Sequence, residues 1–155
     1  MYNWTEERLN DELGEKLTDV GGDPTPILGG DLDLDSNAFV ATLVAGASLA
    51  VGDLCYRRVD NRMVKADASQ DHTANSMLGI ATEVMDEGQA GKFCIKGFFA
   101  STGHASGDLL YMSTTPGTWS RWTPIASGQI VRIIGYGITE SEIFFDPDRT
   151  WIELG

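Results

Sequence analysis

The side chains best suited to catalysis lie in two polar loops. Of the chain's two histidines, His72 follows Asp71, and His104 lies two residues before Ser106. A serine nucleophile needs a histidine base within hydrogen-bonding reach and a carboxylate that orients the base. Asp71, His72 and a serine are therefore the candidates for a small hydrolase. Nothing else in the sequence marks a triad, so we expect both histidines to be surface-loop residues and the protein not to be an enzyme.

A metal site is the second kind of chemistry to consider. Residues 31–37 read DLDLDSN, which places oxygen ligands at every second position, as in an EF-hand calcium loop. Ser36 stands where that loop needs glycine, and Thr42 stands where it needs a bidentate glutamate. We expect a solvated acidic edge here, although three copies of these aspartates could meet a cation on a threefold axis. The sequence has no zinc or phosphate-loop motif, so we expect neither a metal ion nor a cofactor.

A third group is aromatic. Residues 118–122 read TWSRW, which places Trp119, Arg121 and Trp122 in one loop or strand edge. Such indoles pack on the end of a barrel or on a neighbouring subunit, or they stack on a sugar ring or another apolar ligand surface. Both alternatives make Trp119, Arg121 and Trp122 candidate ligand or subunit contacts.

Composition limits the class of protein. The chain has 155 residues and a net charge of −12, which predicts a single domain with or without an appendage and argues against binding a nucleic acid backbone. No window approaches 18 continuous apolar residues, and the acidic N-terminus lacks a basic signal-peptide region, so we expect neither membrane insertion nor export. Cys55 and Cys94 lie inside apolar strand patterns. We expect buried free thiols, which suit synthesis in a reducing cytoplasm.

The elements that must position these side chains form two copies of one β unit. Segment 52–56 (GDLCY) matches 107–111 (GDLLY), and segment 78–81 (LGIA) matches 134–137 (IGYG). Two copies are too few for a solenoid but suit a small barrel or sandwich in which each copy supplies part of the wall.

Short apolar runs separated by turn residues predict an all-β domain over residues 38–155. The expected strands are 39–44, 53–59, 62–65, 77–84, 92–99, further strands of the second copy within 107–137, and closing strands 143–145 and 151–154. A hairpin is expected at Asp60-Asn61, and a polar loop over 67–75.

Residues 1–37 have a different pattern. A helix is expected over residues 3–17, and Gly and Pro residues break it over 20–26. Asp and Leu then alternate over 28–37, which predicts an extended arm. Residues 1–35 contain ten carboxylates, which indicates a solvated tail or a segment that docks on a basic partner. We assign attachment and oligomerisation to these apolar side chains: Trp4, Leu9, Leu13, Leu17, Ile27, Leu28, Leu32 and Leu34.

Two segments resemble virion proteins of tailed bacteriophages. Residues 24–37 (PTPILGGDLDLDSN) resemble the TPxLGGDLDLxGxx lead segment of tail-fibre proteins, with Asn37 giving a different turn. Residues 107–117 (GDLLYMSTTPG), continuing to 131–136 (VRIIGY), are similar to a module of phage fibres and other virion proteins. The resemblance implies a non-enzymatic, homotrimeric structural protein of the virion, made in the bacterial host cytoplasm.

The position on the virion is left open by the resemblance. A tail fibre would attach to other virion proteins through its N-terminal arm and could present its β domain to a host surface receptor. β modules of this kind also resemble capsid decoration or cement proteins, which stabilise the head. In that alternative, the β domain would sit on the major capsid protein and the arm would clasp neighbouring capsid subunits. The LGGDLD lead favours the tail fibre, and the short length favours the decoration protein.

Overall fold

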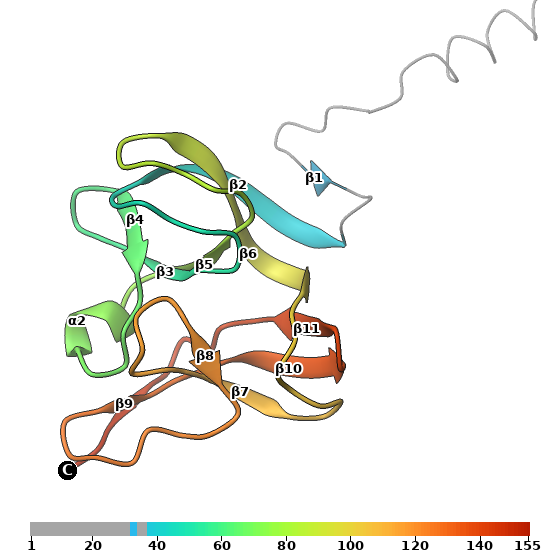
Figure 1. Ribbon diagram of the computed structural model, residues 1–155. Coiled ribbons are helices and arrows are strands. Elements are labelled where there is room, and N and C mark those ends of the chain that lie inside the picture. The colour runs from blue at the N-terminus through green and yellow to red at the C-terminus, as the bar shows by residue number, and fades with distance from the viewer. Residues whose placement is uncertain (1–31, 34–36) are drawn as a thin grey trace, which may run out of the picture. The chain divides into compact units, whose positions relative to one another are not determined.

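The computed structural model describes residues 32–33 and 37–155 (Figure 1). Within these residues the chain is all-β, as predicted, with one short helix. The elements are β1 (Leu32–Asp33), β2 (Ala38–Ala45), β3 (Leu54–Arg57), β4 (Arg62–Lys65), α2 (Asp71–Ala74), β5 (Leu78–Ala81), β6 (Ala90–Ala100), β7 (Leu109–Met112), β8 (Trp119–Ser120), β9 (Ile130–Val131), β10 (Ile133–Thr139), β11 (Glu142–Phe145) and β12 (Ile152–Glu153). No helix in this part of the chain has both the length and the apolar character to cross a membrane.

The predicted helix over 3–17 and most of the predicted arm lie outside the described residues. The same holds for seven of the residues assigned to attachment: Trp4, Leu9, Leu13, Leu17, Ile27, Leu28 and Leu34. The eighth, Leu32, lies in β1, whose backbone pairs antiparallel with the start of β2. The calcium hypothesis for residues 31–37 also falls largely outside the described part of the chain and stays a prediction.

Strands of the first copy close into a small barrel. β2 pairs in parallel with β4, where Val44 lies opposite Arg62, and antiparallel with β6 from Ala38 to Val44. β4, β3, β5 and β6 pair in that order, so five strands form a ring. Closure leaves these strands without free edges over the paired positions.

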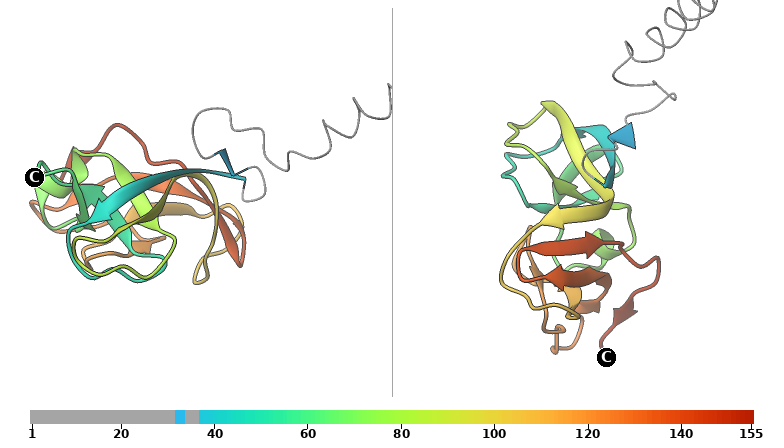
Figure 2. Two further views of the ribbon diagram at one scale, coloured as in Figure 1. Left: turned by 90° about the horizontal axis from the view of Figure 1, so that it is seen from above. Right: turned by 90° about the vertical axis from the view of Figure 1, so that its right-hand side faces the viewer.

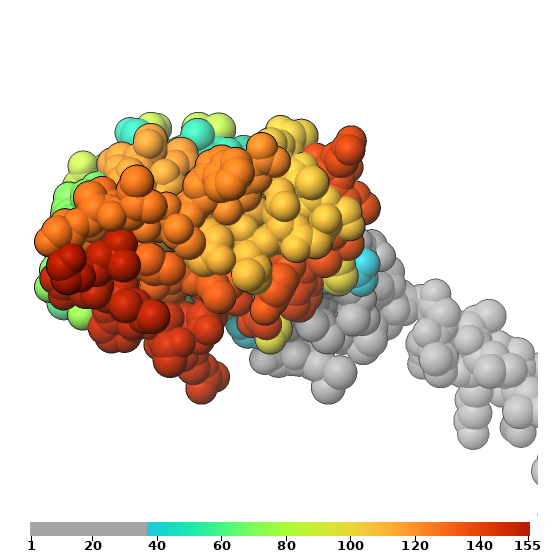
Figure 3. Space-filling view, turned by 90° about the horizontal axis from the view of Figure 1, so that it is seen from below, coloured from blue at the N-terminus to red at the C-terminus, as the bar shows by residue number. Residues whose placement is uncertain are grey.

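Strand β6 connects the barrel to the second half of the domain. Its last residues pair with β11, and the sheet continues through β10 and β7 to β8, which lies at the edge. Figure 2 shows β6, in yellow, passing from the barrel into this second sheet. Figure 3 views the second half from the end opposite the barrel, where the surface is formed mainly by the later part of the chain, coloured gold to red.

The predicted sequence repeat is a structural repeat. In the first copy β3 pairs with β5, and in the second β7 pairs with β10 at equivalent positions. Both copies begin with a glycine–aspartate turn that is bonded to the partner strand in the same way. In the first copy, Gly52 N–H donates to Ala81 O (2.8 Å) and Ala81 N–H donates to Asp53 O (3.0 Å). In the second copy, Gly107 N–H donates to Gly137 O (2.8 Å) and Gly137 N–H donates to Asp108 O (2.8 Å).

The two copies share one hydrophobic core. Leu54 and Ile80 of the first copy pack in the same buried cluster as Leu110 and Ile134 of the second. A second cluster, which includes Phe93, fills the barrel. Because removal of apolar surface from water is the main stabilising term, the copies are expected to fold as one unit.

The cysteines are buried and free, as predicted. Burial disfavours the charged thiolate, and it raises the pKa of Cys55 to about 12 and that of Cys94 to about 11. Burial therefore favours the protonated form of both thiols at neutral pH.

The predicted polar loop over residues 67–75 is partly wrong, because it contains helix α2 with Thr73 and Ala74 buried. The Thr73 hydroxyl donates to the Asp67 carbonyl at 2.6 Å. The buried guanidinium of Arg132 donates to the carbonyl of Ala74, and to that of Ser76 at 2.9 Å. Contacts from residues far away in sequence therefore draw this polar segment onto the core.

The hairpin predicted at Asp60-Asn61 forms. Asn61 has φ 66°, the left-handed conformation that glycine usually supplies. The Asp60 carboxylate is held by the Arg58 guanidinium, which lowers the pKa of Asp60 to about 2.

Candidate functional site

The two histidines do not form a catalytic group with a serine. His72 is exposed, and its Nδ1 lies 3.7 Å from Asp71 Oδ1. Among the described residues, no serine hydroxyl donates a hydrogen bond to the imidazole of His72 or of His104. The prediction that His104 is a surface residue is wrong, because its side chain is buried beside β11 and its Nε2 lies 3.2 Å from the Glu142 carbonyl. Residues 37–155 together with β1 also contain no group of three His, Cys, Asp or Glu side chains placed to hold a metal ion.

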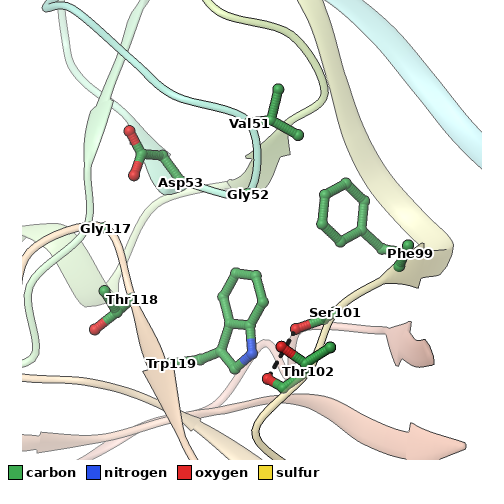
Figure 4. Close-up of a pocket in the computed structure, with 10 residues that line it drawn as sticks. Val51, Gly52, Asp53, Phe99, Ser101, Thr102, Gly117, Thr118 and Trp119 are labelled. Carbon is green, nitrogen blue, oxygen red and sulfur yellow. Dashed lines mark hydrogen bonds between the residues drawn. The ribbon is translucent and has the colours of Figure 1, made fainter. Parts of the chain in front are cut away.

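A cavity of about 420 Å³ lies where the two copies meet (Figure 4), and we call it the junction pocket. It is a hollow in the surface that is largely open to solvent. Its lining comes from three segments that are far apart in sequence, and the residues are Val51, Gly52, Asp53, Phe99, Ala100, Ser101, Thr102, Gly117, Thr118 and Trp119. The volume falls within the range of about 300–1,000 Å³ that is typical of small-molecule sites.

Two aromatic rings form the apolar part of the junction pocket. Trp119 lies on β8 opposite Met112 of β7, and Phe99 lies on β6 opposite Ile143 of β11. The Phe99 and Trp119 rings meet edge to face, with centroids 6.4 Å apart and an interplanar angle of 86°. Both side chains are half-buried and pack against the shared core. The core therefore fixes the orientation of the rings while one surface of each stays accessible.

Backbone hydrogen bonds dock the loop of the second copy that carries Gly117 onto the first copy. Gly117 N–H donates to Ala66 O, and Leu54 N–H donates to Gly117 O, both at 2.8 Å. Gly117 has φ +81°, and a Cβ there would lie 3.0 Å from Lys65 Cδ and 3.1 Å from Asp53 Oδ1. The positive φ therefore favours glycine here, and a side chain at this position would also crowd Lys65 and Asp53.

The junction pocket carries little net charge. Asp53 is its charged residue, and its Oδ2 accepts from Ala50 N–H at 2.8 Å and pairs with Lys65 Nζ at 3.0 Å. In Figure 4 the carboxylate is turned away from the Trp119 ring. Ser101 and Thr102 lie on the side to which the indole nitrogen of Trp119 points. The pocket is therefore apolar on one side and offers neutral polar groups on the other.

The structure separates Trp119 from Arg121 and Trp122, the other two candidate contact residues of the TWSRW segment. Trp119 packs inward and lines the junction pocket. Trp122 is 70% exposed, and the Arg121 guanidinium lies 5.0 Å from the centroid of its ring. Arg121 also lies 3.9 Å from Asp108. Trp122 and Arg121 form an exposed stacked pair outside the pocket lining.

Most of the pocket lining was not found from the sequence. Phe99 lies at the end of an expected strand, and Ser101 and Thr102 lie in the loop of small residues that follows it. No local signal distinguishes them from other strand ends and loops. The glycine–aspartate pair at the start of each copy was noted only as a repeat marker. The position of the first pair, Gly52 and Asp53, in the same pocket as Trp119 depends on how the two copies dock.

A second surface feature is a row of apolar side chains across four neighbouring strands, which we call the apolar row. The strand registers place these residues opposite one another on one face of the sheet, in the order Leu109, Tyr136, Phe144 and Phe98. Leu109 and Tyr136 are 38% and 45% exposed. The rings of Phe98 and Phe144 lie 5.1 Å apart. Side chains facing the core alternate with this row, so the sheet is apolar on both faces here.

No family model and no curated protein matches the chain. The sequence resemblance, the apolar row and the junction pocket are therefore the features that bear on function.

Proposed function

We propose that the chain is a structural protein of a tailed-bacteriophage virion and that it assembles as a homotrimer of the fibre type. Residues 1–37 attach the protein to the particle and contribute to oligomerisation, and residues 38–155 form the β domain. The resemblance of residues 24–37 to tail-fibre lead segments motivates the proposal. The apolar row is the structural observation that supports assembly.

We assign the apolar row to contact with a second copy of this chain. Copies with a net charge of −12 repel one another, so association is favoured where few carboxylates meet. None of the four side chains in the row is charged. An exposed, contiguous apolar surface of this kind is typical of an interaction site.

The apolar row also extends to Phe39, near the start of the β domain. Phe39 of β2 is 57% exposed and lies opposite Lys96 of β6. Lys96 Nζ in turn lies 5.9 Å from the centroid of the Phe144 ring. Phe39 also lies only two positions after residue 37 in the sequence, close to the segment assigned to attachment.

The mass in solution tests the assembly. Light scattering of the full chain is expected to give three times the chain mass of 16.8 kDa. Tyr136→Glu would place a carboxylate in the row and is expected to shift the protein towards monomer. Ile125→Glu is the matched control, because Ile125 is 89% exposed and lies outside the row. A wild-type monomer at micromolar concentration would rule out the proposal.

A capsid decoration protein is the second candidate. It is favoured by the compact β domain, with its closed barrel, next to a leucine- and aspartate-rich arm that could run between capsid subunits. Imaging of labelled virions separates the candidates, because the label would appear at the tail in one case and over the head in the other. Deletion of residues 1–37 is expected to abolish incorporation in both cases. Normal incorporation of the truncated protein would show that the arm is not the anchor.

A further inference from the structure

We propose that the junction pocket binds the ring of a neutral saccharide, with Trp119 as the surface on which the ring stacks. The argument rests on the pocket within a single chain and does not depend on the assembly proposed above.

The apolar side of the junction pocket suits one face of a pyranose ring. A pyranose presents C–H groups on its faces and hydroxyls around its edge. Trp119 offers a broad flat surface, and its edge-to-face contact with Phe99 holds it in place. Val51, which is 58% exposed, borders the same space. A ligand with an apolar face is therefore favoured.

The polar side suits hydroxyl groups. Figure 4 shows Ser101 and Thr102 on the side of the pocket to which the Trp119 indole nitrogen points. Ser101 Oγ makes a long contact of 3.5 Å with the Thr102 carbonyl, so a ligand hydroxyl could replace this weak bond with a better one. Hydroxyls and an indole N–H can donate to, or accept from, the ring hydroxyls of a sugar.

The charge distribution favours a neutral ligand. None of the residues that line the pocket is basic, and Lys65 behind the lining is paired with Asp53 at 3.0 Å. A phosphate or carboxylate ligand would find no free cation there, and it would meet the repulsion of a chain with a net charge of −12.

Binding of a single ring in an open pocket is expected to be weak. A methyl pyranoside has about 13 non-hydrogen atoms, and at the efficiency usual for small ligands this corresponds to a dissociation constant of about 1 mM. An oligosaccharide, or several copies of the protein acting together, would bind more tightly.

The test is an NMR titration of the full-length protein labelled with ¹⁵N. The probes are the methyl pyranosides of glucose, galactose, mannose and N-acetylglucosamine, together with a glycan array. Of the four tryptophan indole N–H signals, those of Trp119 and Trp122 are assigned with Trp119→Phe and Trp122→Phe variants. We expect the Trp119 signal to shift with saturation for at least one sugar, while the Trp122 signal stays in place.

Two exposed valines provide a matched pair of variants that should not disturb the core. Val51→Arg would fill the pocket and is expected to weaken binding at least about tenfold. Val59→Arg adds the same charge at a position that is 100% exposed and does not line the pocket, and it is expected to leave binding unchanged. An equal effect of the two variants would overturn the inference.

Two other results would overturn the inference. One is the absence of binding to every glycoside and every glycan on the array. The other is a Trp119 shift caused by phenol in the absence of a shift caused by any sugar, which would indicate an apolar ligand. A monomeric protein that binds a sugar at Trp119 would support this inference while ruling out the assembly.

Discussion

The two glycine–aspartate turns contain the same hydrogen bond, from a backbone N–H to the aspartate carboxylate, in two different surroundings. Asp53 Oδ2 accepts from Ala50 N–H, and Asp108 Oδ2 accepts from Ala105 N–H, both at 2.8 Å. Each carboxylate also faces a cation. Lys65 Nζ lies 3.0 Å from Asp53, whereas the nearest Arg121 nitrogen lies 3.9 Å from Asp108. The perturbation is replacement of each aspartate by alanine.

The expected magnitudes follow from these contacts. Loss of the turn hydrogen bond to the carboxylate is expected to cost about 1 kcal/mol in both copies. The ion pair adds about 1 kcal/mol at Asp53, whose side chain is 14% exposed, and close to nothing at Asp108, whose side chain is 29% exposed and whose pair is longer. We expect Asp53→Ala to lower the free energy of unfolding by about 2 kcal/mol and Asp108→Ala by about 1 kcal/mol.

The difference is measurable by urea unfolding of the full chain at one fixed protein concentration, because oligomers make apparent stability depend on concentration. A difference of about 1 kcal/mol corresponds to about 4 °C in Tm for a domain of this size. Removing one negative charge from an acidic chain affects both variants alike and cancels in the comparison. If Asp108→Ala costs as much as Asp53→Ala, then the ion pair contributes nothing and the reasoning is wrong.

Replacement of each aspartate by asparagine separates the contribution of the turn hydrogen bond from that of the ion pair. An amide oxygen can still accept the turn hydrogen bond but cannot pair with a cation. Asp53→Asn is therefore expected to cost about 1 kcal/mol, and Asp108→Asn is expected to cost close to nothing.

Three further predictions follow from buried groups. Arg132→Met is expected to destabilise the fold by about 3 kcal/mol in urea unfolding, because the Arg132 side chain is buried and donates to three carbonyls that would lose their partner; a cost below about 1 kcal/mol would contradict this. The free energy of unfolding is expected to fall from about pH 9 towards pH 12, since the raised pKa values of Cys55 and Cys94 keep both thiols protonated in the folded state while unfolded thiols ionise near 9.0. The double alanine variant should lose that part of the pH dependence. Gly97→Ala is expected to prevent correct pairing of β2 with β6, because its Cβ would lie 2.4 Å from Ala38 Cα at a φ of +130°; native-like circular dichroism and an unchanged Tm would refute this.

Much of the fold could be predicted from local pattern. The alternation of side chains along each strand and the turn residues between strands indicated an all-β domain, and the repeated GDL(C/L)Y segments located two equivalent turns. The apolar surroundings of Cys55 and Cys94 correctly predicted that both thiols are buried. These features depend on residues within a few positions of one another, so a single sequence is enough to recognise them.

The candidate site could be predicted only in part. Trp119 was identified as a contact residue because the local sequence TWSRW places two tryptophans in a loop or strand edge. Its separation from Trp122, and its pairing with Phe99, depend on the docking of the second copy onto the first through Gly117. The buried position of His104 likewise depends on contact with β11, which lies some forty residues later in the chain.

The sequence by itself therefore determined the class of fold, its twofold internal repeat and the burial of its thiols. Tertiary structure alone decided that β2 pairs in parallel with β4 to close a barrel, that the last residues of β6 continue into the second sheet, and that three distant segments line the junction pocket. The physical reason is that side-chain alternation specifies which face of a strand is buried. It does not specify which strand lies beside it, because that choice is made by packing and hydrogen bonds between residues far apart in the chain.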